Sequence, residues 1–196
     1  MKLSKNILFF LFFGISYPFF SQSITVDDTR NSNDLVSLLV GNSCAAISNI
    51  QVSSNKSVAY FNQNGSTFPI SEGILIRSGI ASHTQGSYTG TNLDSQINTN
   101  SDADLLQINN NSGQTSQITD VAFLEFDFVP PSTNFNFNFL FSSNEYGEWQ
   151  CGFSDVFAFI LTDLVTGEKI NLAVVPSSGN PISVKEIINT ILRVIL

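Results

Sequence analysis

Residues 134–141 read NFNFNFLF, and this run decides the fold class. Phenylalanine occupies positions 135, 137, 139 and 141, and asparagine occupies positions 134, 136 and 138. Because side chains of a strand alternate between its two faces, the four rings point to one side and the amides to the other. The pattern predicts a strand that faces the core.

The flanking sequence extends this pattern. Residues 122–128 alternate in the same way until Pro130-Pro131 blocks continuation. Residues 156–161 are apolar on both faces and predict a central buried strand, followed by a strand at 170–175 across a turn at Thr166-Gly167. Three short apolar runs between polar clusters predict further strands: 47–52, 58–61 and 74–76.

Only one segment has a helical pattern. Residues 33–41 open with capping residues, space their apolar side chains as a helix does, and stop at Gly41. Residues 82–120 contain few large apolar groups and predict a long, mostly irregular loop. The predicted fold class is therefore mainly β: an antiparallel β-sandwich or jelly-roll-like domain with one short N-terminal helix.

The N-terminus has the three parts of a secretory signal peptide. Lys2 and Lys5 precede an apolar run at 7–20, and small or polar residues follow at 21–23, so residues 1–22 are predicted to be a cleaved leader. An uncleaved anchor is the alternative, although a span needs roughly 20 apolar residues. The junction resembles signal peptides of the Bacteroidetes. The mature protein is expected outside the cytoplasm, secreted or at the cell surface, with no membrane span.

The charge of the mature chain limits its partners. Two of the eight basic residues lie in the leader, so six remain against 16 acidic residues, a formal charge of −10. Nucleic acid is excluded as a partner because phosphate backbones are bound by clustered Lys and Arg. We expect an extracellular ligand instead, such as a glycan or a surface protein.

The two cysteines, Cys44 and Cys151, both lie in the exported part. An oxidising compartment permits a disulfide between them, and closing so long a loop would contribute about 4 kcal/mol in the chain-entropy model. The alternative is two free buried thiols.

Residues for nucleophilic catalysis are scarce. The one histidine, His83, stands in the polar loop, where it is expected to be solvated, and no GxSxG motif occurs. Paired carboxylates are the better basis for catalysis, because a glycosidase uses two of them across a cleft. The candidates are Glu125, Asp127, Glu145, Glu148 and Asp155. The chain is predicted not to be an enzyme, and a secreted glycan-active hydrolase is the alternative.

Hard oxygen ligands for calcium are also present. Asp102 and Asp104 are two positions apart, and Glu145 and Asp155 could add further carboxylates. The spacing of an EF-hand does not occur, and the competing interpretation is ordinary loop acids. Calcium at these four residues is the metal prediction.

Three aromatic residues stand in polar surroundings. Tyr88, Tyr146 and Trp149 are candidates for contacting a ligand from loops. For Tyr146 and Trp149 the alternative is packing in the core or in a turn.

Eight segments in order resemble the choice-of-anchor L domain of secreted proteins from Bacteroidetes and other bacteria. These segments are 35–50, 73–79, 102–105, 124–128, 141–146, 153–159, 171–176 and 181–184. The resemblance implies a β-rich extracellular domain on proteins held at the cell surface by one of several anchoring signals. It implies no established catalytic activity, and adhesion, binding or structural display is the expected function.

The C-terminal end departs from this resemblance. Residues 23–186 correspond to an incomplete choice-of-anchor L domain, whereas residues 187–196 form an atypical apolar tail, expected to be a short helix or strand. The domain is therefore expected to be truncated.

Overall fold

A computed structural model describes residues 23–41, 43–53, 56–86, 95–99, 101–113, 117–132, 134–143, 145 and 155–188. The predicted leader and most of the predicted tail lie outside these ranges. The elements are β1 (Thr25–Asp27), α1 (Ser32–Val40), β2 (Ala46–Val52), β3 (Val58–Asn62), β4 (Glu72–Ile76), η1 (Ala81–Thr84), α2 (Ala103–Asn111), β5 (Leu124–Val129), β6 (Val156–Phe157), β7 (Ile160–Thr162), β8 (Lys169–Asn171), β9 (Ile182–Ser183) and α3 (Val184–Ile188).

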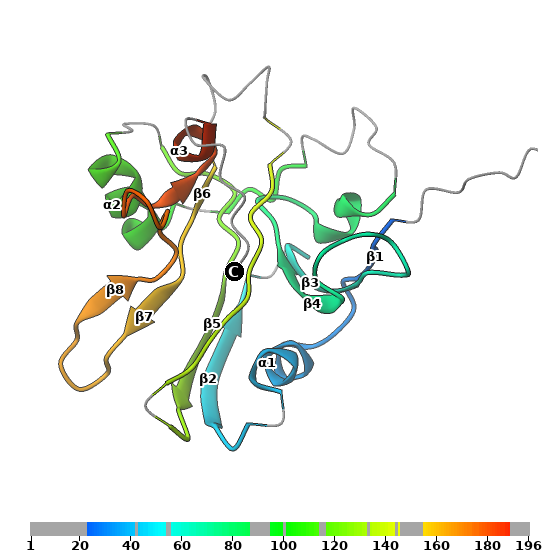
Figure 1. The fold of residues 1–196 in the computed structure, drawn as a ribbon, viewed down its shortest axis with the longest axis horizontal. Helices are drawn as coiled ribbons and strands as arrows, with labels where there is room; N and C mark the ends of the chain where they lie inside the picture. Colours follow the sequence, from blue (N-terminus) through cyan, green and yellow to red (C-terminus); the bar gives the residue numbers. More distant parts are fainter. Residues whose placement is uncertain are drawn as a thin grey trace, which may run out of the picture.

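The strands in the described ranges form four small sheets, and every pairing among them is antiparallel. Strand order is β1-β3-β4 in the largest sheet, and β2-β5, β6-β9 and β7-β8 form pairs. Figure 1 shows the β2–β5 ribbon at the centre, β3 and β4 on one side, and the β7–β8 hairpin on the other. The prediction of a mainly antiparallel β domain is confirmed.

A β-bulge lies in the central β2–β5 ribbon. Ser48 pairs with Asp127 and Gln51 with Glu125, so β2 has one residue more than β5 between these pairs. Asn49 adopts φ 52° there, a left-handed conformation that asparagine tolerates, and its amide donates to the Asp127 carboxylate. The bulge therefore has its own side-chain hydrogen bond.

The predicted N-terminal helix is confirmed as α1. The Asn31 side chain accepts a hydrogen bond from the Asp34 backbone N–H at 3.0 Å, and Gly41 ends the helix with φ 54°. Leu35 and Val36 are buried where α1 packs against β2 and β4. Its sequence thus sets its start, its end and its buried face.

The prediction of a single helix was wrong. Region 82–120, expected to be irregular, contains α2 and most of η1, and α3 begins at Val184. The Asp102 side chain accepts a hydrogen bond from the Leu105 N–H at 2.9 Å and so caps the N-terminus of α2. Most residues of this helix are polar. The mixed composition hid it, because apolar periodicity is the main signal for a helix.

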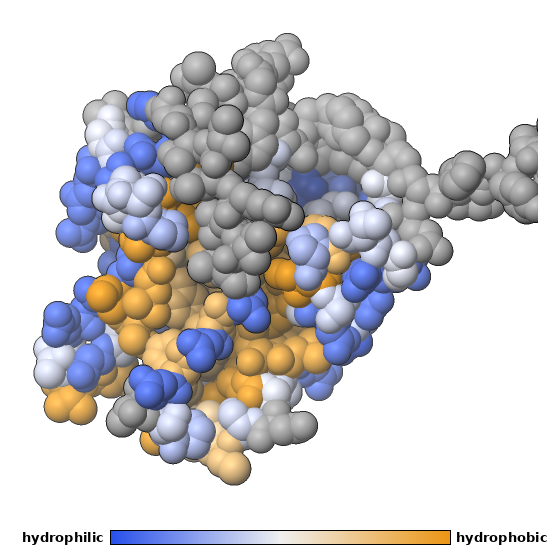
Figure 2. Space-filling model, viewed as in Figure 1, coloured by the Kyte–Doolittle hydropathy of each residue, from blue (hydrophilic) through white to orange (hydrophobic). Residues whose placement is uncertain are grey.

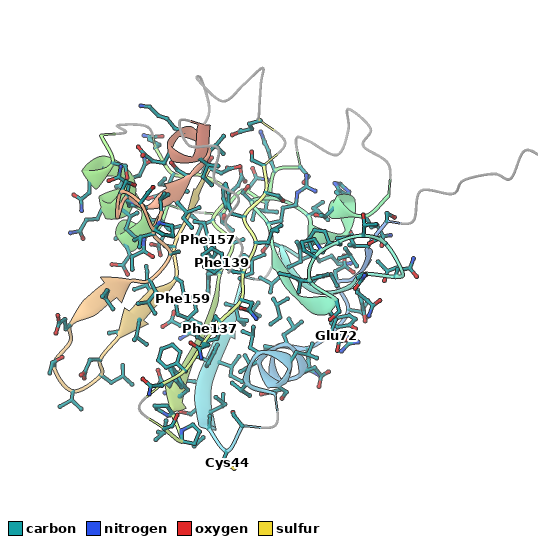
Figure 3. All side chains as sticks on the ribbon, in the orientation of Figure 1. Cys44, Glu72, Phe137, Phe139, Phe157 and Phe159 are labelled. Carbon is teal, nitrogen blue, oxygen red and sulfur yellow. The ribbon has the colours of Figure 1, made fainter. Side chains whose placement is uncertain are left out.

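Residues 134–141 correct another prediction, because they belong to no strand. The segment runs beside β5 in Figure 1, but it is held by ring contacts rather than by a ladder of backbone hydrogen bonds. The Phe137 and Phe159 ring centroids are 4.6 Å apart, and those of Phe139 and Phe157 are 5.3 Å apart. Figure 3 shows these four rings between the segment and the β6–β7 region. Phe137, Phe139 and Phe141 are half-buried as the alternation predicts, whereas Phe135 is exposed.

The prediction of one central buried strand at 156–161 was also wrong. This segment is split into β6, which pairs with β9, and β7, which pairs with β8. Between them the Phe159 N–H donates to the Asn171 side chain at 3.0 Å, so an amide replaces a ladder bond at the change of partner. All six residues are half-buried rather than buried. The turn before β8 is confirmed, with Gly167 at φ 74°.

The aromatic contacts form two groups of rings, together called the phenylalanine ladder: one runs from β5 through Phe135 and Phe137 to Phe159, and the other joins Phe139 and Phe141 to Phe157. Rings in contact lie 4.6–6.5 Å apart, and the ladder joins β5, segment 134–141, β6 and Phe159 in the stretch between β6 and β7. Its members are Phe126, Phe128, Phe135, Phe137, Phe139, Phe141, Phe157 and Phe159. Four of them pack against a small core of Ala173, Val175 and Ile182.

Shortening one ring of the ladder should destabilise the domain. For Phe137→Ala we expect a loss of about 2–3 kcal/mol in the free energy of unfolding, somewhat below the range for a fully buried phenylalanine because Phe137 is half-buried. Asn136→Ala is the matched control, since Asn136 is exposed and points to the other side. Urea denaturation measures both. Equal midpoints for the two variants would contradict the assigned role of the ladder.

Candidate functional site

A group of charged and polar side chains gathers where the loop after β4 meets the residue before β6. The Ser78 hydroxyl donates to the Asp155 carboxylate at 3.4 Å, and the Asp155 carbonyl accepts from the Val184 N–H at 3.1 Å. Arg77 and Glu145 lie within electrostatic range of Asp155. These residues, Arg77, Ser78, Glu145 and Asp155, are called the Asp155 site below.

The loop that carries Arg77 and Ser78 is held in place by a close backbone approach at Gly79. Its φ is 150°, and a Cβ there would lie 2.5 Å from the Ser95 hydroxyl oxygen. That hydroxyl accepts from the Ile80 N–H at 2.9 Å. Only glycine fits at this position, and the contact ties the loop to residues 95–99.

Desolvation governs the acids of the site. Asp155 keeps contact with solvent, but the surrounding protein displaces much of its hydration, and this raises the pKa of its carboxyl. The Ser78 hydrogen bond and the Arg77 charge oppose that rise, and the charge of Asp120 adds to it. The pKa of Glu145 is raised by burial and then by the charge of Asp155, whose backbone N–H donates to it. The two acids are therefore electrostatically coupled.

Three buried polar atoms have no hydrogen-bond partner within the described part of the chain: His83 Nδ1, Thr99 Oγ1 and Glu145 Oε2. Orphaned buried atoms are rare in folded proteins. For His83 the structure differs from the expectation of a solvated residue, because η1 holds the ring half-buried. The Glu145 oxygen places one such atom in the Asp155 site.

The four predicted calcium ligands occupy two places. Asp102 caps α2, and Asp104 forms an ion pair with Lys169, Oδ2 to Nζ 2.7 Å. Glu145 and Asp155 interact with one another instead. Among the residues that the structure describes, no group of three or more acids, histidines or cysteines has the arrangement of a metal site. Calcium binding by these four residues stays a prediction.

The other predicted carboxylates are also separated. The hydrogen bond that Lys169 donates to Asp104 is the main cause of the raised pKa of Lys169, and the charges of Asp102 and Glu125 add to it. Asp127 binds the Asn49 amide in the bulge of β2. Glu148 lies outside the described residues, as do Tyr88, Tyr146 and Trp149.

The disulfide remains untested. Cys44 is exposed in the loop between α1 and β2, at one end of the molecule in Figure 3. Its predicted partner, Cys151, lies outside the described residues, so the disulfide stays a prediction.

Three residues of this region were not predicted from the sequence: Arg77, Ser78 and Asp120. A charged residue directly after the apolar run 74–76, followed by Ser-Gly, was the available signal for the first two. Asp120 had no such signal: one of its carboxylate oxygens accepts from the N–H groups of Ile97 and Asn98, both at 2.8 Å. These two hydrogen bonds link Asp120 to residues that lie 23 and 22 positions earlier in the chain.

Fold and site together define a small antiparallel β domain with a coupled acid pair at one junction. The chain matches the sequence profile of the choice-of-anchor L domain over residues 24–194 and belongs to that family. The matched span continues into the stretch described above as the apolar tail. No curated protein and no solved structure matches the chain.

Membership in this family makes the chain a module of a secreted or surface protein, and the family is not one of enzymes. None of the helices that the structure describes has the length and apolar character needed to cross a membrane.

The raised pKa of Asp155 gives a pH-dependent prediction. A carboxyl whose pKa is higher in the folded protein destabilises the fold while charged, and that penalty disappears as pH falls through its folded pKa towards the unfolded value. Asp155→Asn should therefore raise the melting temperature at pH 7, with a gain that shrinks near pH 4. Differential scanning calorimetry across this range measures it.

Asp27→Asn is the control of opposite sign. Hydrogen bonds from Thr29 lower the pKa of Asp27, so this carboxylate stabilises the folded protein when charged. Its replacement should lower the melting temperature at pH 7. A decrease for Asp155→Asn as well would mean that its contacts with Ser78 and Arg77 outweigh desolvation.

Proposed function

We propose that the chain is an exported, non-catalytic module that acts through adhesion, ligand binding or structural display at the cell surface. The observation that supports this most is the family match over residues 24–194. The signal-peptide pattern of residues 1–22 agrees with export. The acidic composition favours a neutral or basic extracellular partner, such as a glycan or a surface protein.

The proposed contacts are aromatic. Tyr88 and Trp149 stand in polar, glycine-containing sequence, and Tyr146 precedes Gly147. Tyrosine and tryptophan combine a large apolar ring with a polar O–H or N–H group, so they bind partners that have both apolar and hydrated polar surface. Such side chains also dominate the affinity of binding surfaces.

Replacing Trp149 tests this proposal. Trp149→Ala should weaken binding to an immobilised cell-surface polysaccharide by roughly 30-fold, the effect of removing one dominant contact. Phe123→Ala is the control, because Phe123 is also an exposed aromatic residue but was not proposed to contact a ligand. Binding is measured by surface plasmon resonance. Equal affinity for both variants would exclude Trp149 as the contact.

A secreted glycan-active hydrolase is the second candidate, and one observation favours it. Glu145 and Asp155 interact, and burial raises the pKa of both. A carboxyl with a raised pKa is what a general acid requires, and its neighbour could serve as base or nucleophile. Ordinary structural acids show the same shift when they are desolvated, so the coupling does not by itself make a catalytic pair.

Activity measurements separate the two candidates. We expect the mature chain and Glu145→Gln to release no reducing ends from polysaccharides. Hydrolysis by the wild-type chain that falls by roughly 10²–10⁴-fold in Glu145→Gln would replace the binding module with the hydrolase.

A further inference from the structure

The outer edge of β8 is an open strand edge. Glu168 and Leu172 direct their backbone groups towards β7: the Asp163 N–H donates to the Glu168 carbonyl at 2.9 Å and the Leu172 N–H donates to the Phe159 carbonyl at 2.8 Å. In an antiparallel pair such residues alternate with residues whose backbone groups point away. The backbone N–H and C=O of Lys169 and Asn171 therefore face outward, and within the described chain β8 pairs with β7 alone.

One face of this hairpin is apolar and exposed. Ile170 lies opposite Leu161 and is 54% exposed, and at the tip Leu164 and Val165 are 72% and 95% exposed. Figure 2 shows apolar residues at the free end of the hairpin, at the lower left. Exposed apolar surface along a strand edge is typical of a pairing site.

The opposite face carries excess negative charge. Lys169 points to that face, where Asp104 binds its ammonium at 2.7 Å, and Asp102 and Glu125 lie close enough to interact with it. A lysine protects an edge strand by its charge, but here three carboxylates surround one ammonium. The face therefore attracts cations rather than repelling a neighbouring strand.

We propose that the β8 edge accepts a β-strand from a partner protein, one that alternates apolar and basic side chains. The outward groups of Lys169 and Asn171 supply the main-chain hydrogen bonds. The apolar side chains of the added strand cover Ile170, and its basic side chains meet Asp102, Asp104 and Glu125. A second copy of this chain does not fit this requirement, because its mature part has 16 acidic residues against six basic ones. The inference goes beyond the proposed function and does not involve Trp149.

A pair of six-residue peptides tests the proposal, one alternating valine with lysine and the other alternating valine with glutamate. The lysine peptide should bind the mature chain in fluorescence polarisation, and the glutamate peptide should bind at least tenfold more weakly. A peptide with the lysine composition but with its three valines in one block should also bind more weakly, because it lacks the alternation.

Lys169→Pro is the decisive variant, since it removes the outward N–H while the residues facing β7 keep theirs. It should lose at least tenfold in affinity for the lysine peptide, and Lys169→Ala, which keeps the N–H, should not. Ile170→Thr retains a β-branched side chain but removes apolar contact, so it should weaken binding severalfold even if the proline variant does not fold. Undiminished binding to Lys169→Pro or to Ile170→Thr, or equal binding of all three peptides, would overturn the proposal.

Discussion

The contact between Phe137 and Phe159, 4.6 Å between ring centroids, is the link on which the arrangement of the sheets depends. It joins a segment that has no backbone ladder to the strand pairs β6–β9 and β7–β8. The neighbouring rings extend the contact to β5 on one side and to Ala173, Val175 and Ile182 on the other. Side-chain packing rather than sheet hydrogen bonding therefore connects the two halves of the domain.

The Asp155 site provides a second link between segments that are distant in the sequence. Asp155 directly precedes β6, and its carbonyl binds the first N–H of α3, while its carboxylate reaches Ser78 on the loop after β4. The same residue thus contacts three parts of the fold that are distant in sequence. Its desolvation follows from this central position, and so does its coupling to Glu145. Under either proposed function, Asp155 is an acid whose negative charge is unfavourable in the folded state.

The sequence predicted the parts of the fold that depend on local pattern. The end of α1 at Gly41, its buried face, the β7–β8 turn at Gly167 and the inward direction of most of the phenylalanine rings follow from spacing along the chain, whereas the N-cap is Asn31, two positions before the predicted start. Strand pairing does not, because the partner change between β6 and β7 depends on the Asn171 side chain, twelve positions from Phe159. Glu145 and Asp155 were predicted as candidates because they are acids close together in the sequence, whereas the contact of Ser78 with Asp155 and those of Asp120 with Ile97 and Asn98 join distant positions and are seen only in three dimensions.

The extra residue in β2 has a consequence for how its length can evolve. Ile47 lies opposite Phe128 and Val52 opposite Leu124, and these apolar pairs share one face only because the bulge changes the odd–even parity between positions 47 and 52. Deleting Asn49 would leave four steps between these two positions on both strands, so the pairing would become regular and both side chains would keep their face. The extra residue is therefore not needed for the register of this ribbon, and a shorter gene product that lacks it would still present the same apolar face.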